Sequence, residues 1–117
     1  MAVQNIEKSK WDAFLAGISR ALAGKRVEIE VASLDLGDQI VVSRLPLLAI
    51  SYDRKDDVIS VNLEQVDHLI RAPSELYVDF ASAGLACLEI IDGEGARQIL
   101  TLTDPLALPE PETQQAD

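Results

Sequence analysis

The chain has 117 residues and a mass of 12.7 kDa, with 48% hydrophobic and 26% charged residues, which is typical of one soluble folded domain. Twenty acidic residues against ten basic ones give a formal charge of −10, which would repel nucleic acid and anionic membranes and argues against both as partners. One Cys, one His and the lack of a long apolar run exclude a disulfide framework, a zinc site of protein ligands alone and a membrane helix.

The first predicted element is an amphipathic helix. Its apolar residues recur at helical spacing and share one face, which places the only tryptophan in the core; they are Trp11, Phe14, Leu15, Ile18 and Leu22. Ser9 is the predicted N-cap, with Asp12 three residues later as its capping-box partner. Gly24 is the predicted C-terminal stop.

After Gly24 the apolar period changes from 3.6 to 2, which predicts about seven short strands. These strands are 27–31, 40–43, 47–52, 58–63, 76–80, 85–91 and 98–103. Pro46 cannot donate to a strand ladder, so we expect a bend or a sheet edge there. The Gly-Asp pair in residues 34–39, the charged loop 53–57 and the sequence DGEG at 92–95 predict turns.

These elements predict an α+β, mainly β fold in which the N-terminal helix packs on a small bent antiparallel sheet, either open or closed into a barrel. The continuous apolar run at 85–91 is typical of a strand buried on both faces, and we expect it beneath the helix. We expect one folded domain at residues 6–104. Residues 105–117, which are acidic and rich in proline, are expected to be a disordered tail.

Two features resemble chemical sites, but simpler explanations fit them better. The loop 53–57 holds three carboxylates, and carboxylates are ligands for calcium. Because the loop lacks the spacing and the glycine of an EF-hand loop, we interpret it as a solvated hairpin. Cys87 lies in the most apolar strand with no basic neighbour, so we expect a small buried hydrophobic residue. The sequence therefore predicts no catalytic residue, no metal ligand and no cofactor.

His68 is the one side chain that would change charge near neutral pH. Asp67 precedes it directly, but neighbouring residues in an extended segment point to opposite sides, so this carboxylate is not expected to orient the imidazole. We expect His68 to bond to the backbone near the bend at Pro73.

Several short motifs give the chain a resemblance to a family of small bacterial proteins catalogued as a domain of unknown function. The motifs are Trp11-x-x-Phe14, Gly24-Lys25-Arg26-Val27, Gly37-Asp38-Gln39, Leu45-Pro46-Leu47, Ile50-Ser51-Tyr52-Asp53 and Asp67-His68-x-Ile70-x-x-Pro73. The resemblance covers residues 8–102 and implies an intracellular bacterial protein of one domain. It transfers no catalytic role. The polar positions within these motifs are the candidate binding residues: Asp38, Tyr52, Asp53, Asp67 and His68.

We therefore expect a cytoplasmic, non-enzymatic binding or interaction module, with a protein partner or a homodimer formed through an open sheet edge or the helix surface. The first alternative is a small ligand-binding protein or enzyme that uses paired carboxylates at a barrel mouth. It requires a pocket that holds two or more of Asp38, Asp53, Asp67 and His68. The second alternative is a protein whose acidic face occupies a basic partner.

Overall fold

The computed structural model describes residues 2–81 and 84–103, and it is mainly β with one α-helix at its N-terminal end, as the sequence predicts. In chain order the elements are β1 (Ala2–Asn5), the 3₁₀ turn η1 (Lys8–Lys10), α1 (Trp11–Leu22), β2 (Arg26–Ser33), β3 (Gly37–Asp53), β4 (Val58–Leu63), β5 (Val66–Arg71), β6 (Glu75–Ala81), β7 (Gly84–Ile91) and β8 (Arg97–Thr103). Within the described residues, no helix is long and apolar enough to cross a bilayer. The predicted tail at 105–117 lies outside the described residues.

The eight strands form one antiparallel sheet in the order β1-β6-β7-β8-β2-β3-β4-β5, which curls but does not close into a barrel. The predicted count of about seven differs from this in three places. Two predicted strands are one continuous strand, β3, while β1 and β5 were not predicted. β5 follows a two-residue turn in which Gln65 adopts φ +72°, a left-handed conformation that the sequence does not signal with a glycine.

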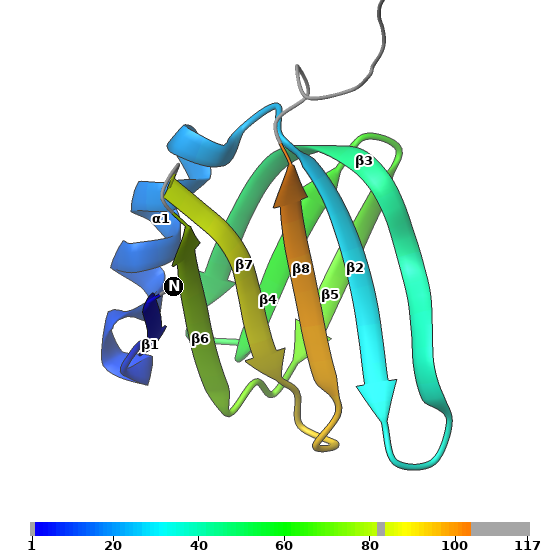
Figure 1. The fold of residues 1–117 in the computed structure, drawn as a ribbon. Helices are drawn as coiled ribbons and strands as arrows, with labels where there is room; N and C mark the ends of the chain where they lie inside the picture. Colours follow the sequence, from blue (N-terminus) through cyan, green and yellow to red (C-terminus); the bar gives the residue numbers. More distant parts are fainter. Residues whose placement is uncertain (1, 82–83, 104–117) are drawn as a thin grey trace, which may run out of the picture.

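The strand β3 folds the sheet into two layers. Its first part, as far as Pro46, pairs with β2, and its second part, from Leu47, pairs with β4. Three register shifts and a left-handed residue, Arg44 at φ +57°, bend the strand between these two pairings. Pro46 therefore lies at the bend, as predicted, and Figure 1 shows β3 passing over the top of the molecule from one layer to the other.

The helix ends as predicted but begins differently. Gly24 adopts φ +90° and ends the helical segment. The N-cap is Lys10 without a side-chain bond, because the chain enters the helix from η1 rather than from an extended Ser9. Asp12 pairs instead with Arg54, at 3.2 Å. The predicted Ser9 cap and its Asp12 partner are therefore wrong.

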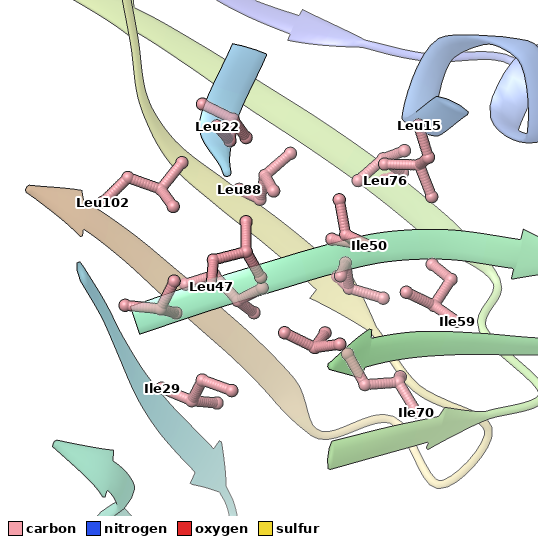
Figure 2. Close-up of a cluster of buried hydrophobic side chains, with 14 of the residues drawn as sticks. Leu15, Leu22, Ile29, Leu47, Ile50, Ile59, Ile70, Leu76, Leu88 and Leu102 are labelled. Carbon is pink, nitrogen blue, oxygen red and sulfur yellow. The ribbon is translucent and has the colours of Figure 1, made fainter. Parts of the chain in front are cut away.

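The core lies between the two layers and beneath α1. Figure 2 shows its leucine and isoleucine side chains converging from the helix and from both layers of the sheet. Trp11 is 1% exposed, which confirms its predicted place in the core. The helix packs against β3, where the Ser19 hydroxyl accepts a hydrogen bond from the Ile50 backbone N–H.

The strand β7 departs from the prediction of two buried faces. Leu88 and Ile90 are fully buried, but Cys87 and Glu89, which alternate with them, are only partly covered. One face of β7 therefore meets the core and the other borders solvent, so its apolar run does not mark a strand enclosed on both sides. Cys87 is accordingly half-buried rather than buried, and burial raises the pKa of its thiol.

Candidate functional site

The five predicted binding residues do not share one pocket. Asp38 lies at the start of β3, Tyr52 and Asp53 lie at its end, and Asp67 and His68 lie on β5. Asp38 and Asp53 each line a hollow on the surface, but neither hollow contains a second residue of the predicted set. These residues therefore lie in three separate parts of the fold.

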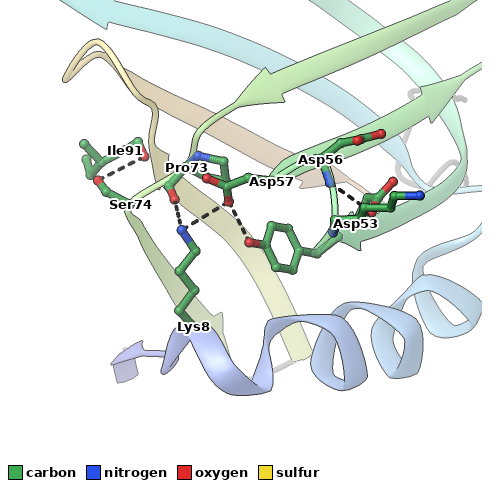
Figure 3. A network of polar contacts seen from close by, with 9 residues as sticks. Lys8, Asp53, Asp56, Asp57, Pro73, Ser74 and Ile91 are labelled. Carbon is green, nitrogen blue, oxygen red and sulfur yellow. Dashed lines mark hydrogen bonds and ion pairs between the residues drawn. The ribbon is translucent and has the colours of Figure 1, made fainter.

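Tyr52 belongs to a polar junction between the N-terminal segment and the β3–β4 turn (Figure 3). Its hydroxyl donates to Asp57 Oδ1 at 2.6 Å, and Lys8 Nζ lies 3.1 Å from the same oxygen. Lys8 also donates to the Pro73 carbonyl at 2.9 Å. Burial, followed by the bond to the Asp57 carboxylate, raises the pKa of Tyr52 to about 12, and the Tyr52 and Lys8 donors lower the pKa of Asp57.

Aromatic packing supports the same junction. The rings of Trp11 and Tyr52 meet edge to face with centroids 5.2 Å apart, and Lys8 Nζ lies 5.3 Å from the Trp11 ring centroid. Trp11 Nε1 donates to the Ile6 carbonyl at 2.7 Å. These contacts hold the segment before α1 against the sheet, so the geometry of Tyr52 is that of a structural contact.

Asp53 shapes the turn that follows β3. Its Oδ1 accepts hydrogen bonds from the backbone N–H groups of Lys55 and Asp56, at 2.9 and 3.3 Å (Figure 3). This is the charged hairpin that the sequence predicts. Among the described residues, no three His, Cys, Asp or Glu side chains gather closely enough to hold a metal ion.

The side chains of Asp67 and His68 have different partners. Asp67 is exposed and accepts a hydrogen bond from Asn62 on the neighbouring strand, at 3.0 Å. His68 is half-buried, and its Nε2 lies 2.7 Å from Gln98 Oε1 on β8, in the other layer. The predicted bond from His68 to the backbone near Pro73 is therefore wrong, because the curl of the sheet brings β5 and β8 together.

A chain of hydrogen bonds continues from His68 to the β7–β8 turn. Gln98, which is 7% exposed, donates from Nε2 to Asp92 Oδ2 at 2.9 Å. The other carboxylate oxygen of Asp92 accepts the backbone N–H groups of Glu94 and Ala96, both at 2.9 Å. His68 thus supports the shape of the β7–β8 turn through Gln98 and Asp92. Sequence reasoning missed both partners; Asp92, which precedes a Gly in a turn, was the only local signal.

The β7–β8 turn and the β2–β3 turn lie side by side at one end of the sheet (Figure 1). Between them lie two hollows of about 500 and 410 Å³, whose walls share Ser33, Leu34 and Gly95. We call these two hollows together the hairpin groove. Its residues are Ala32, Ser33, Leu34, Asp35, Leu36, Asp38, Glu94, Gly95, Ala96 and Arg97. Sequence reasoning treated 34–39 only as a turn and predicted just Asp38 from this set.

The hairpin groove combines exposed leucines with acidic residues. Leu34 and Leu36 are 105% and 72% exposed, and Asp35, Asp38 and Glu94 are exposed around them. The groove's one cation, Arg97, pairs with Glu89 at 3.3 Å. A hydrogen bond with Asp38, together with its negative charge, raises the pKa of the neighbouring Glu30.

Comparisons with known proteins connect the chain to a family. Residues 2–111 match a family model described as "Family of unknown function (DUF5335)". The chain is also 38% identical over 111 residues to a protein of the bacterium Aquifex aeolicus (strain VF5) described as "Uncharacterized protein", covering 94% of this chain and 100% of that protein. No solved structure matches the chain. The predicted resemblance to small bacterial proteins of unknown function is confirmed.

Proposed function

Because the chain belongs to the DUF5335 family, whose function is unknown, we propose from the geometry that it is a non-enzymatic interaction module that binds a protein partner at the hairpin groove. One observation carries this proposal: four of the large apolar side chains that are exposed lie within eight consecutive residues, in the β2–β3 turn and the first part of β3. They are Leu34, Leu36, Ile40 and Val41.

Such clustering favours an interaction surface. Single exposed apolar residues are common on folded proteins, whereas a contiguous apolar patch with a polar rim is typical of a contact site. Burying a leucine side chain that is otherwise in water contributes about 1.5–3 kcal/mol. Leu34 and Leu36 are the two most exposed of the four and are the two that line the groove, so we take them as its apolar anchors.

The neighbouring sheet edge is a poorer candidate. Within the described residues, no strand pairs with the outer edge of β3 before Leu47. That edge is irregular, because the register with β2 shifts twice and Arg44 adopts a left-handed conformation. Bulges of this kind disfavour the addition of another strand. We therefore propose binding through side chains at the groove rather than dimerisation through this edge.

The enzyme or small-ligand alternative receives less support from the same geometry. It requires one concave site that holds two or more of Asp38, Asp53, Asp67 and His68, whereas the hollows that Asp38 and Asp53 line contain no second residue of this set. His68 instead bonds to the buried Gln98, and Asp67 bonds to Asn62. Asp53 shares its hollow with Asp56 and Arg71, but its carboxylate already holds the backbone of its own turn.

The proposal is tested by selecting peptides from a random display library on the full chain and mapping the bound peptides by amide NMR. We expect shifts in residues 32–38 and 94–97. The double substitution Leu34→Ser/Leu36→Ser should weaken binding by at least about tenfold, since a tenfold loss corresponds to about 1.4 kcal/mol.

The matched control is Leu48→Ser/Leu69→Ser, which removes two other leucines that are 56% and 43% exposed. Circular dichroism should show both double variants folded, because all four side chains are exposed. Peptide shifts confined to another face of the sheet, or equal losses in the two variants, would contradict the proposed site.

A further inference from the structure

We infer that the hairpin groove takes an extended segment of a partner protein in which large apolar side chains alternate with Lys or Arg. This inference rests on the proposed function and names the chemistry of the partner. It depends on two features of the groove, the exposed leucines and the excess of acidic residues.

The apolar side chains of the segment would pack against Leu34 and Leu36. The larger hollow, of about 500 Å³, has these two leucines on the β2–β3 side and Ala96 on the β7–β8 side. Ala96 is only 9% exposed, so it forms a fixed wall, while both leucines extend into solvent. An apolar side chain seated between the turns would cover the leucines without moving the sheet.

The charges of the groove favour a basic segment. Asp35 and Glu94 flank the larger hollow and Asp38 flanks the smaller one. None of these three carboxylates lies within an ion pair of the described residues, and the one basic residue of the groove, Arg97, is paired with Glu89. A hydrogen bond with Asp38 and desolvation raise the pKa of the neighbouring Glu30, and the negative charge of Asp38 adds to them. A Lys or Arg side chain would relieve this repulsion.

The same charges argue against a second copy of this chain as the occupant. A two-fold interface places the same surface patch of both copies against each other. Asp35, Asp38 and Glu94 of one copy would then face the same carboxylates of the other, and the chain as a whole carries −10. The bulged edge of β3 also disfavours strand pairing between copies.

The test uses the composition and salt dependence of the selected peptides. A random eight-residue display library is panned on the full chain in low-salt buffer, and affinities of the enriched peptides are measured by fluorescence anisotropy. We expect enrichment of Lys and Arg next to large apolar residues. We also expect binding to weaken at least about tenfold when salt is raised from low to several times physiological concentration.

Charge variants separate a local effect from the general attraction of an acidic protein for basic peptides. Asp35→Asn/Asp38→Asn/Glu94→Gln removes three carboxylates of the groove. Glu7→Gln/Asp56→Asn/Glu64→Gln removes three exposed carboxylates outside it and changes the net charge equally. We expect at least about tenfold weaker binding for the groove variant and less than about threefold for the control.

Each other result overturns a defined part of the inference. Peptides without basic residues that still depend on Leu34 and Leu36 would overturn the charge argument and leave the proposed function standing. Equal losses in the two charge variants would also overturn it. The absence of any peptide that depends on the two leucines would overturn both. Self-association that Leu34→Ser/Leu36→Ser abolishes, without peptide binding, would identify a second copy as the occupant.

Discussion

His68 Nε2 lies 2.7 Å from Gln98 Oε1, and this contact joins the edge strand β5 to β8 in the opposite layer of the sheet. The amide orientation of Gln98 follows from its other partner, because the ionised Asp92 carboxylate only accepts hydrogen bonds and so requires Gln98 Nε2 as the donor. Gln98 therefore presents its oxygen to the imidazole. His68 must carry a proton on Nε2 for the bond to form.

This relationship predicts the tautomer of the neutral His68 ring. Long-range ¹H–¹⁵N NMR of the neutral ring should show the proton on Nε2 and none on Nδ1, since only that tautomer donates to Gln98. Gln98→Leu removes the acceptor, and the preference should then shift toward the mixture seen in free histidine. A neutral ring protonated mainly on Nδ1 in the unmodified chain would contradict the assigned hydrogen-bond chain.

The junction around Tyr52 predicts how stability depends on pH. The folded pKa of Tyr52, about 12, lies above its ordinary value of 10.0, so its contribution is complete below pH 10 and is lost as pH rises toward 12. The pKa of Asp57 is lowered in the fold, so its contribution is present above the ordinary value of 3.8 and is lost as pH falls below it. The junction therefore stabilises the fold between these limits.

Tyr52→Phe tests this window. It should lower the free energy of unfolding near pH 7 by about 1 kcal/mol, the usual net value of one hydrogen bond, and the difference from the unmodified chain should shrink above pH 10 and below pH 4. Urea unfolding at several pH values measures it. Tyr77→Phe is the control for the loss of a tyrosine hydroxyl outside this junction, because the Tyr77 hydroxyl bonds to Glu75 on its own strand and not to Asp57. A difference that stays constant with pH would contradict the coupling to Asp57.

Asp38 and Glu30 give a prediction about charge at the hairpin groove. The hydrogen bond with Asp38 is the largest cause of the raised pKa of Glu30, and the Asp38 charge adds to it. Asp38→Asn removes that charge, so the pKa of Glu30 should fall toward its ordinary value of 4.5, as measured by NMR titration of its carboxyl carbon. Asp67→Asn, which changes the net charge equally on another strand, should leave the pKa of Glu30 within about 0.2 units.

Hydrophobic periodicity predicted the helix and most of the sheet, since Val27, Ile29 and Trp11 occupy the core positions that their spacing indicates. It failed where local pattern was weak. Residues 2–5 and 66–71 carry few alternating apolar residues, and both are edge strands. The partner of β1 is β6, far along the chain, whereas β5 pairs with the preceding strand β4 through a two-residue turn that the sequence does not signal with a glycine. The pattern predicts two strands where β3 is one, because bulges and the left-handed Arg44 interrupt the alternation without ending the strand.

The candidate site was less accessible to sequence reasoning. In the sequence, Gln98 is one polar residue in a predicted strand, and nothing near it indicates a partner. Its contact with His68, thirty positions away, exists only because the sheet curls. Asp38 was predicted, but the groove beside it was not. The groove forms only where the β2–β3 turn meets the β7–β8 turn, and these two turns are far apart in the sequence. Leu34 and Leu36 did provide a signal, because two leucines in a turn break the polar pattern that such loops usually follow. Their exposure shows that the fold does not bury these two leucines, which supports the proposed contact site.

The close approach of Gly93 to Ala72 yields a further prediction, about the β7–β8 turn. A Cβ built on Gly93 would lie 2.7 Å from the Cβ of Ala72 and 3.2 Å from its carbonyl oxygen. Gly93→Ala should therefore destabilise the fold by about 1–3 kcal/mol, since the β7–β8 turn must move away from the end of β5. Gly17→Ala is the control: nothing lies within 4 Å of its Cβ position, and in helix α1 it should stabilise by up to about 1 kcal/mol.

A double-mutant cycle with Ala72→Gly assigns this cost to the side-chain contact. Ala72 adopts φ +50°, so its replacement by glycine relieves a left-handed conformation as well as removing the Cβ that Gly93→Ala would meet. The cost of Gly93→Ala should fall by at least about 0.5 kcal/mol in the Ala72→Gly background, as contacting residues couple. The Ala72 and Arg71 carbonyl oxygens remain at 3.2 and 3.3 Å, so part of the cost should persist. Thermal unfolding of the four proteins measures the cycle, and strictly additive changes would show that the two Cβ positions do not meet.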